Sequence, residues 1–418
     1  MAAEGDENYL TTAEVARRLQ VKPETIYAYV SRGLLTSTRA RGRRGSLFSA
    51  TEVERLASRS VDHSGVVERI ESQLTLLEND ELYYRGHPAS RLATTWTVEQ
   101  VAHLLWTART PEGPPRNAAS AASPASSAMA AFAGSREGVE LARRALGVVP
   151  EGARLTDGLR VAVAVLGAAD ALRFDLSVPA VTAAAGRLIG TLVTALPDVT
   201  EQPPDPGDDA PSDATLGARL WSKLSAEPPR PEVLDAALIL LADHGLAVST
   251  VAARVAASAR ANLYAVISAG LGALDGQYHG AAPTLAYEFL QRARQDPLKA
   301  LSDQLRSGEP IPGFGHKIYQ QRDPRADVLL GLLGDHPIVG TIAAIAERTP
   351  TFPNSDLAIA AVMDAYNFRP DAGDALFALA RMIGWTAHAL EEYAAPALRF
   401  RAMGVYTGQV LSGSPDRT

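Results

Sequence analysis

Apolar residues recur at helical spacing through most of this 418-residue chain, and that periodicity limits the possible folds more than any other feature. Examples are Val161, Val165 and Leu166, and farther along Leu238, Leu241 and Leu246. Because Ala, Leu, Arg and Glu are abundant around these positions, the pattern predicts a mostly α-helical protein. With 46% hydrophobic residues, the chain is long enough for two or three cores, at roughly 150 residues per domain.

Charge and cysteine content exclude several classes of function. A net charge of -7 is modest for this length, so any binding to nucleic acid must be local. The chain has no cysteine, which removes disulfides, thiolate metal sites and thiol nucleophiles. Its beginning, MAAEGDENYL, lacks the basic flank and apolar run of a signal peptide, and no run of 18 apolar residues follows. We therefore expect a cytoplasmic protein.

Two stretches interrupt the helical texture. They are PEGPPRNAASAASPASSAMAAFAG at residues 111–134 and TEQPPDPGDDAPSDA at residues 200–214. Dense Pro, Ser, Gly and Asp cannot bury enough apolar surface to offset the entropy of ordering. We expect both to be mobile surface loops.

The first sixty residues read as a separate unit. Thr12 can cap a short helix, AEVARRL, and ETIYAYVSRG supplies a second helix with Ile26 and Val30 on one face. This is the spacing of a helix-turn-helix. The following LLTSTRARGRRGSLFSA reads as a hairpin or wing, and TEVERLAS as a closing helix. Eight Lys or Arg lie between Arg17 and Arg44, with only Glu24 among the acids.

Residues 8–58 resemble the winged helix-turn-helix of MerR-type regulators and excisionases, and we take 1–60 as the domain. The resemblance implies that residues 24–32 enter a major groove while the basic wing meets phosphates. The positions that this assigns to DNA are Thr25, Tyr27, Arg32, Arg39, Arg41, Arg43 and Arg44. The alternative is a small helical adaptor whose arginines are only solvated.

Three histidines lie in polar or glycine-rich surroundings instead of on apolar helical faces. They are His244 in ADHGLAVST, His279 in LDGQYHGAA and His316 in GFGHKIY. Nearby glycines, which permit sharp turns and close approach to a ligand, are Gly276 and Gly280 beside the second and Gly313 and Gly315 before the third. Arg325 follows in DPRA, where Asp323 and Pro324 predict a turn. Imidazole and guanidinium on one loop suit a carboxylate substrate with a carbonyl group to polarise.

Five motifs in one order give a more specific indication. The series ADH, GxxHG, GFGHxxYxxxDPRA, PNxD and ARxxGWxAHxLE is similar to the citrate synthase and methylcitrate synthase family, from about Ser64 to the C-terminus. LLENDELYYRGHPASRLATTWTVEQVAHLLW also looks like the family's first strands and helices. The resemblance implies a large domain of residues 64–274 plus 375–418 and a small domain of residues 275–374.

The resemblance also implies roles for single residues. His279 would stabilise the enol or enolate of acetyl-CoA, Asp356 would remove a proton from its methyl group, and His316 would donate to the ketone oxygen of a 2-oxo acid. The substrate carboxylates would meet His244, Arg325, Arg381 and Arg401. From the residues alone, Asp356 could equally be a helix N-cap, and Arg381 a surface cation with a buried stem.

Partners and cofactors follow from the same resemblance. Oxaloacetate and acetyl-CoA or propionyl-CoA are the implied substrates, with acyl-CoA as co-substrate and no permanently bound cofactor or metal. A homodimer is implied, with Arg401 reaching the neighbouring subunit's site. Residues near the coenzyme would be Gly313, Phe314, Gly315 and Lys317.

Several positions depart from the family pattern. Leu357, Ala358 and Ile359 follow Asp356 where DFYS is usual, and Gln320 replaces a basic residue suited to the CoA phosphate, a charge that Lys317 or Arg322 could supply. The departures leave open a second interpretation, a transcription regulator whose citrate synthase-like domain senses a metabolite. Neither the motifs nor the departures separate acetyl-CoA from propionyl-CoA, because one methylene changes selection by only about 1–3 kcal/mol.

Overall fold

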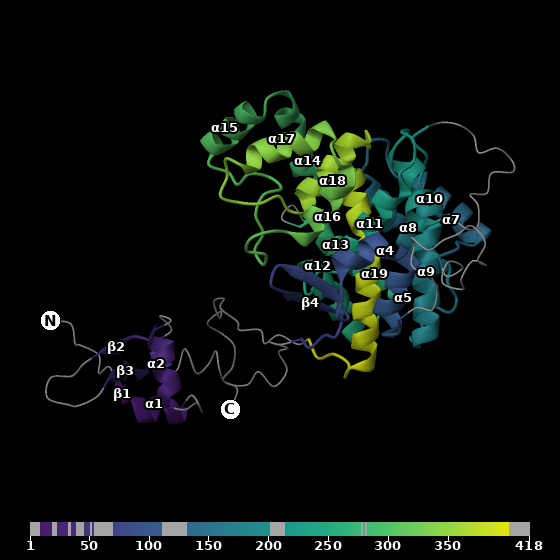
Figure 1. The fold of residues 1–418 in the computed structure, drawn as a ribbon. Coiled ribbons are helices and arrows are strands. Elements are labelled where there is room, and N and C mark those ends of the chain that lie inside the picture. The colour runs from purple at the N-terminus through teal and green to yellow at the C-terminus, as the bar shows by residue number, and fades with distance from the viewer. Residues whose placement is uncertain are drawn as a thin grey trace, which may run out of the picture. The chain divides into compact units, whose positions relative to one another are not determined.

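The computed structural model describes two compact units, residues 1–70 with 399–418 and residues 71–398 (Figure 1). The described residues are 9–18, 23–31, 35–38, 46–50, 52–53, 70–110, 132–200, 214–276, 279–280 and 282–400. The two stretches predicted as mobile loops lie almost wholly outside these ranges.

Among its described residues, the first unit contains a small three-stranded sheet and helices α1 and α2. In chain order its elements are β1 (Tyr9–Thr11), α1 (Thr12–Arg18), α2 (Pro23–Ser31), β2 (Ser37–Thr38) and β3 (Leu47–Ser49). The strands are antiparallel in the order β1-β3-β2, so the predicted hairpin is confirmed by the pairing of β2 with β3. Ile26 is fully buried against Val15 and Phe48, and Val30 packs on the same cluster, as the helical spacing predicts.

The cap of α1 differs by one residue from the prediction. The Thr11 hydroxyl accepts from the Glu14 N–H, and the Glu14 carboxylate accepts from the Thr11 N–H at 2.7 Å. This reciprocal capping box selects Thr11, because Glu14 then stands three residues after the cap. Thr12 is therefore the first helical residue. Of the predicted closing helix TEVERLAS, Glu52 and Val53 are helical, as is Ala50 just before it, and the rest lies outside the described residues.

The second unit begins with an antiparallel sheet and continues as helices. The strands are β4 (Thr75–Glu78), β5 (Glu81–Tyr84) and β6 (His87–Pro88). The helices up to the third histidine motif are α4 (Ala89–Thr95), α5 (Val98–Thr107), α7 (Arg136–Leu146), α8 (Leu155–Ala169), α9 (Val178–Ala195), α10 (Leu216–Leu224), α11 (Pro231–Leu241), α12 (Val248–Ser258), α13 (Leu263–Leu274), α14 (Ala282–Gln295) and α15 (Pro297–Ser307). Those after it are α16 (Pro324–Leu333), α17 (Pro337–Ala346), α18 (Ser355–Ala365) and α19 (Ala372–Ala394).

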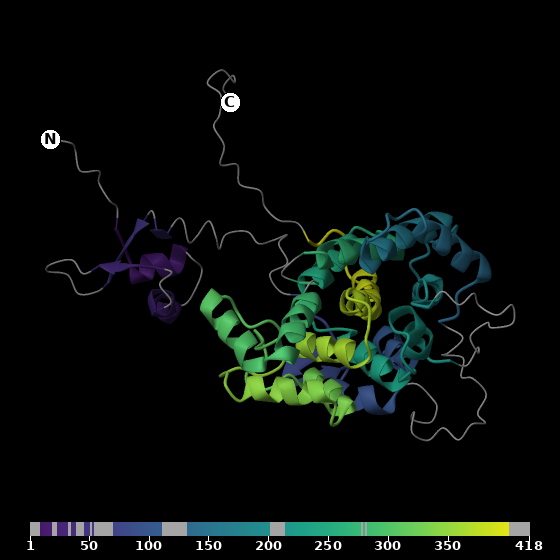
Figure 2. The same ribbon diagram turned by 90° about the horizontal axis from the view of Figure 1, so that it is seen from above.

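Helix α19 is the centre of the second unit. It is buried along almost all of its 23 residues, and it contacts α5, α8, α9, α11, α12, α13, α14 and α18. Its alanines and glycine let neighbouring helices approach closely, which a helix of bulky residues would not permit. Figures 1 and 2 show α19 enclosed by these helices, with α14 to α18 gathered on one side of it.

Helices α11 and α9 bear on two of the sequence predictions. Leu246 does not continue the apolar face of Leu238 and Leu241, because α11 ends at Leu241 and Leu246 is 41% exposed. Helix α9 is long and apolar enough to cross a membrane by length and composition, but more than half of it is buried, as in the core helix of a globular protein. The boundaries predicted at 274/275 and 374/375 fall inside the second unit and stay a prediction.

Candidate active site

The loop that carries His316 is fastened to the segment that carries Asp356. Gly313 and Gly315 have φ of +79° and +76°, a left-handed conformation that favours glycine. The Gly313 carbonyl accepts from the Asn354 N–H at 2.9 Å, and the Gly315 carbonyl accepts from the Asn354 side-chain amide at 2.9 Å. The Gly315 N–H donates in turn to the Phe352 carbonyl at 2.8 Å. The glycines therefore place the two predicted catalytic segments side by side.

The backbone fixes the tautomer of His316. Its Nδ1 accepts from the N–H groups of Ile318 at 3.1 Å and Tyr319 at 3.3 Å. Burial, with the Arg325 charge, lowers the pKa of His316 to about 4, so the ring is neutral at physiological pH. A neutral ring that accepts at Nδ1 carries its proton on Nε2. His316 can thus donate one hydrogen bond to a substrate oxygen.

His244 lies beside His316, as the motifs imply. Their ring centroids are 5.2 Å apart, and His244 Nε2 is 3.0 Å from the Tyr319 hydroxyl. Burial and the charge of Arg325 place the pKa of His244 well below its ordinary value, so this ring is also neutral. Two neutral imidazoles and a phenol therefore form one polar wall.

Arg325 is buried and already paired. Asp323 and Pro324 do not form an isolated turn: Asp323 is the N-cap of α16, and Pro324 is its first residue. The Arg325 guanidinium donates from Nε to Asp323 Oδ1 at 2.9 Å and from Nη2 to Oδ2 at 2.7 Å. Burial opposes its charge, yet the Asp323 carboxylate raises the pKa of Arg325. Among the described residues, Nη1 of Arg325 has no hydrogen-bond partner.

Asp356 is not the N-cap of α18. That position belongs to Asn354, whose side chain accepts from the N–H groups of Asp356 and Leu357. Within the part of the chain that the structure describes, no group donates a hydrogen bond to the half-buried Asp356 carboxylate. Burial raises its pKa to about 6, although the charges of Arg325 and Arg381 work against the shift. A carboxylate of this pKa, with unoccupied acceptors, suits a general base near neutral pH.

Arg381 is not a surface cation. Its side chain is 2% exposed, its Nε donates to the Leu241 carbonyl at 2.8 Å, and its guanidinium carbon lies 4.6 Å from the centre of the Phe377 ring. Its Nη1 is buried without a hydrogen-bond partner among the described residues. A buried N–H of a charged group left unpaired is costly, so this atom calls for an acceptor such as a carboxylate.

His279 meets the same aromatic ring from another side. Its ring centroid is 6.1 Å from that of Phe377, and its Nε2 is 2.7 Å from the Ser249 hydroxyl, which is buried. Burial, with the Arg381 charge, lowers the pKa of His279 to about 4. In the tautomer in which Nε2 accepts from Ser249, the neutral ring carries its proton on Nδ1, where it can donate to a substrate.

The predicted CoA-binding and DNA-binding positions lie partly within and partly outside the described residues. Phe314 pairs with Pro353 in an isolated β-bridge, and Lys317 is exposed. Arg322 is paired with Asp327 at 2.7 Å and Glu81 at 3.5 Å. On α2, Thr25 is half-buried and Tyr27 is 61% exposed. Arg401 and the five predicted DNA-contacting arginines, Arg32, Arg39, Arg41, Arg43 and Arg44, lie outside the described residues.

Comparison with protein families identifies both parts of the chain. The C-terminal domain of citrate synthase matches residues 65–401. The chain belongs to the citrate synthase family. A helix-turn-helix domain matches residues 9–60. Together these confirm the mostly helical citrate synthase-type fold and the helix-turn-helix that precedes it.

Similar proteins carry two enzyme names. A citrate synthase of Haloferax volcanii is 30% identical, with 81% of this chain and 93% of that protein aligned. A 2-methylcitrate synthase of Mycobacterium tuberculosis is 29% identical over 81% and 88% of the two chains. Among solved structures, the citrate synthase of Thermoplasma acidophilum, in complex with carboxymethyl coenzyme A and oxaloacetate, has a TM-score of 0.65 at 23% identity, covering 82% of this chain and 95% of that one. The structural likeness supports the fold.

The motif analysis assigns no role at the site to three residues that contact it, of which Tyr319 and Asp323 lie within a motif and Ser249 lies outside the motifs. Tyr319 contacts both neighbouring histidines, Ser249 holds His279, and Asp323 neutralises Arg325. Asp323 has a local signal, since an Asp before Pro is typical of a helix N-terminus. Ser249 and Tyr319 meet their partners 30 and 75 residues away, and spacing alone carries no signal for such contacts.

A buried charged network lies behind His244. Asp243 accepts from Thr75 at 2.5 Å, from the Gly245 N–H at 3.1 Å and from His388 Nε2 at 3.2 Å. Arg254 donates to Nδ1 of His388 at 2.6 Å, which leaves the His388 proton on Nε2. This saturated arrangement agrees with a structural position for His388 and fixes the turn that presents His244. In the described part of the chain, no group of three or more His, Asp or Glu side chains could hold a metal ion.

Proposed function

We propose that the protein condenses an acyl-CoA with oxaloacetate and hydrolyses the resulting thioester, giving citrate or 2-methylcitrate and CoA. The observation that carries the proposal is the open hydrogen-bonding capacity of two opposite charges, the carboxylate of Asp356 and Nη1 of Arg381. A base without a donor and a buried cation without an acceptor fit a substrate that offers both an acidic C–H and a carboxylate.

The geometry supports a division of roles in the condensation. Asp356 takes a proton from the carbon next to the thioester carbonyl, and the N–H of His279 stabilises the enol oxygen. The enol carbon then attacks the ketone carbon of oxaloacetate, while Nε2 of His316 donates to the ketone oxygen. Water hydrolyses the thioester, and CoA leaves as the thiol.

The substrate carboxylates have cationic and neutral donors available. Nη1 of Arg381 offers a buried charged donor, and Nη1 of Arg325 remains after its pairing with Asp323. His244 completes the set as a neutral donor, and Arg401 is assigned by resemblance alone. Neutral histidines matter here, because additional buried positive charges would trap the anion too tightly for turnover.

Acyl-CoA is the proposed co-substrate, without a permanently bound cofactor. The Thermoplasma relative holds a coenzyme A derivative, which supports a thioester site in this fold. Gly313, Phe314 and Gly315 form the adjacent loop, and Lys317 is exposed beside it. Because Arg322 is engaged by Asp327 and Glu81, Lys317 is the better candidate to replace the charge that Gln320 lacks.

We also propose a homodimer and retain the cytoplasmic location as a prediction. Three large apolar side chains within the α8–α9 connection and at the first residue of α9 are exposed: Leu172 by 76%, Phe174 by 68% and Val178 by 49%. A second copy of the chain would cover this surface, and an obligate dimer would allow Arg401 to complete the neighbouring site.

Release of thiol from acetyl-CoA and from propionyl-CoA, each with oxaloacetate, tests the enzymatic proposal. We expect release that requires oxaloacetate and is lost in Asp356→Ala. The ratio of kcat/KM for the two thioesters assigns the acyl group, which the relatives' names leave open. Clear binding of oxaloacetate with no release above the Asp356→Ala control would refute catalysis and support the metabolite-sensing interpretation.

A second proposed activity, binding to DNA, rests on the helix-turn-helix match at residues 9–60. Exposed Tyr27 on α2 and the basic sequence after it fit contacts to bases and phosphates. We expect salt-sensitive retention of DNA by the full chain and none by a chain that begins at Ser64. Equal retention by both would contradict this assignment.

A further inference from the structure

We propose that Asp80, which belongs to none of the catalytic motifs, is a positioning residue that clasps the His316 loop from the tip of the β4–β5 hairpin. The inference rests on the proposed function, because it assigns Asp80 to the same site. It adds a residue whose role depends on a contact between segments 240 positions apart in the chain.

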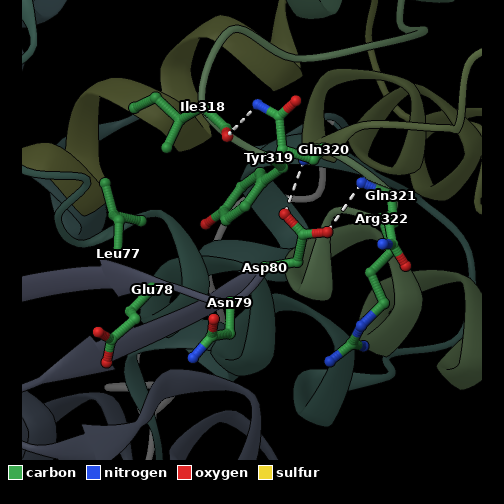
Figure 3. A pocket seen from close by; sticks show the side chains of 9 residues that line it. All are labelled: Leu77, Glu78, Asn79, Asp80, Ile318, Tyr319, Gln320, Gln321 and Arg322. Atoms are coloured by element: carbon green, nitrogen blue, oxygen red, sulfur yellow. Dashed lines mark hydrogen bonds between the residues drawn. The ribbon is translucent and has the colours of Figure 1, made fainter.

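The contact is a two-point hydrogen bond to the backbone. Asp80 Oδ1 accepts from the Gln320 N–H at 2.7 Å, and Oδ2 accepts from the Gln321 N–H at 2.8 Å. Figure 3 shows the carboxylate pointing at these two successive amides. The hydrogen bond from the Gln320 amide has the largest effect on the pKa of Asp80 and lowers it, and the bond from the Gln321 amide lowers it further. The group therefore stays ionised at neutral pH.

The hairpin turn is shaped to present this carboxylate. Glu78 pairs with Glu81, which leaves Asn79 and Asp80 as a two-residue turn with φ of 52° and 56°. Positive φ at both positions is the geometry of a type I′ turn, where glycine commonly takes the second place. Asp in that place bears a backbone cost that glycine would avoid, and the two hydrogen bonds of its side chain offset that cost.

The clasped amides follow directly on residues of the site. Tyr319 precedes Gln320, contacts His244 through its hydroxyl and lies with its ring centroid 4.7 Å from that of His316. At the start of β4, the strand that leads to the Asp80 turn, Thr75 donates to Asp243, the neighbour of His244. The hairpin thus holds both histidine segments, one at its base and one at its tip.

The clasp is in contact with solvent and can open. A pocket of about 460 Å³ lies between residues 77–80 and 318–322, and the two glutamines are exposed (Figure 3). Hydrogen bonds in such a place form and break more readily than those in the core. Asp80 therefore favours the arrangement of His316 and Tyr319 that binds the oxo acid, without locking it.

Amide hydrogen exchange of the full chain tests the contact directly. We expect Asp80→Asn and Asp80→Gly to speed exchange at Gln320 and Gln321 about tenfold or more, since a charge-assisted pair is lost while the turn is kept. Glu78→Gln is the matched control: it removes an exposed carboxylate from the same pocket rim and should leave exchange unchanged.

Binding and kinetics then test the positioning role. Both Asp80 variants should weaken oxaloacetate binding, measured by calorimetry, and raise its KM about tenfold, with an unchanged melting temperature. Wild-type exchange rates in both variants, or faster exchange with wild-type oxaloacetate affinity, would overturn the proposal. A wild-type protein without thiol release would refute the proposed reaction, whereas exchange and calorimetry would still decide the role of Asp80.

Discussion

Asp323 with Arg325 and Asp356 with Arg381 are two acid–arginine combinations in opposite hydrogen-bonding states. Asp323 and Arg325 share two side-chain hydrogen bonds, and Asp323 also accepts from the backbone of Ser355. Asp356 has no donor among the described residues, and Nη1 of Arg381 has no acceptor among them. The first pair is engaged within the structure apart from Nη1 of Arg325, whereas the carboxylate of Asp356 and Nη1 of Arg381 are both left open for a ligand.

The largest effect is expected for Asp356→Asn. If the free carboxylate is the base, kcat for thiol release should fall about 10²- to 10⁴-fold, because proton abstraction loses its acceptor. Calorimetry should show oxaloacetate binding close to that of the wild type. A kcat within threefold of the wild type would place the base elsewhere.

Arg325→Met should mainly reduce stability. It leaves Asp323 fully buried with an uncompensated charge, which costs about 3–5 kcal/mol in the free energy of unfolding. Chemical denaturation measures the change. Arg322→Met is the control, since that arginine is 51% exposed and its ion pairs should contribute less than about 1 kcal/mol. Equal losses in the two variants would show that the buried Asp323–Arg325 pair contributes no more to stability than the exposed ion pairs of Arg322.

Arg381→Met should mainly weaken substrate binding, with a smaller effect on stability than Arg325→Met. Loss of a charged donor to the substrate should raise the KM for oxaloacetate about 10- to 100-fold. The free energy of unfolding should change by less than about 2 kcal/mol, because the variant also removes a buried, incompletely paired charge. Steady-state kinetics and denaturation of the same preparation provide both values. A loss of stability as large as that of Arg325→Met, with unchanged KM, would show that Arg381 stabilises the structure and does not bind the substrate.

The pH dependence of kcat/KM and of stability tests whether the carboxylate of Asp356 is the open base. The pKa of Asp356 is raised to about 6, so kcat/KM should fall roughly tenfold per unit as pH drops below 6. Because the folded state holds this proton more tightly than the unfolded chain, the wild type should gain stability relative to Asp356→Asn between about pH 7 and pH 4. The pKa of Asp374 is also about 6, so Asp374→Asn must retain the activity profile. If kcat/KM of Asp374→Asn no longer fell at low pH, the fall in the wild type would be assigned to Asp374 instead of Asp356.

The sequence predicts those parts of the fold that depend on neighbours within a few residues. Helical periodicity locates α8 and the part of α11 that holds Leu238 and Leu241, and the pairing of β2 with β3 is expected from the composition between them. Errors are also local: the cap falls on Thr11 because of Glu14, and Asp323 begins a helix instead of forming a turn. Each reflects a competition between adjacent side chains for the same backbone groups.

The site is predictable only in part. Motif order brings His244, His316, Asp356 and Arg381 to attention, and the structure places His244 beside His316. Motif order does not indicate that Arg381 is buried with Nη1 unpaired or that Tyr319 contacts two histidines, because these states depend on the packing of distant helices. The clasp from Asp80 has no local signal at all, since its partners are backbone amides.

The distances along the chain between contacting groups have a consequence for how the protein is made. The Gln73 N–H donates to Glu391, 318 residues later, and Arg254 is paired with both Glu391 and Glu392. Contacts of such separation form late in folding. During synthesis, the helices before α19 can collapse locally, but Arg381 and the partners of Arg254 that α19 supplies are added only after those helices have been made. A nascent chain therefore cannot complete the arrangement around Arg381 until α19 has been added.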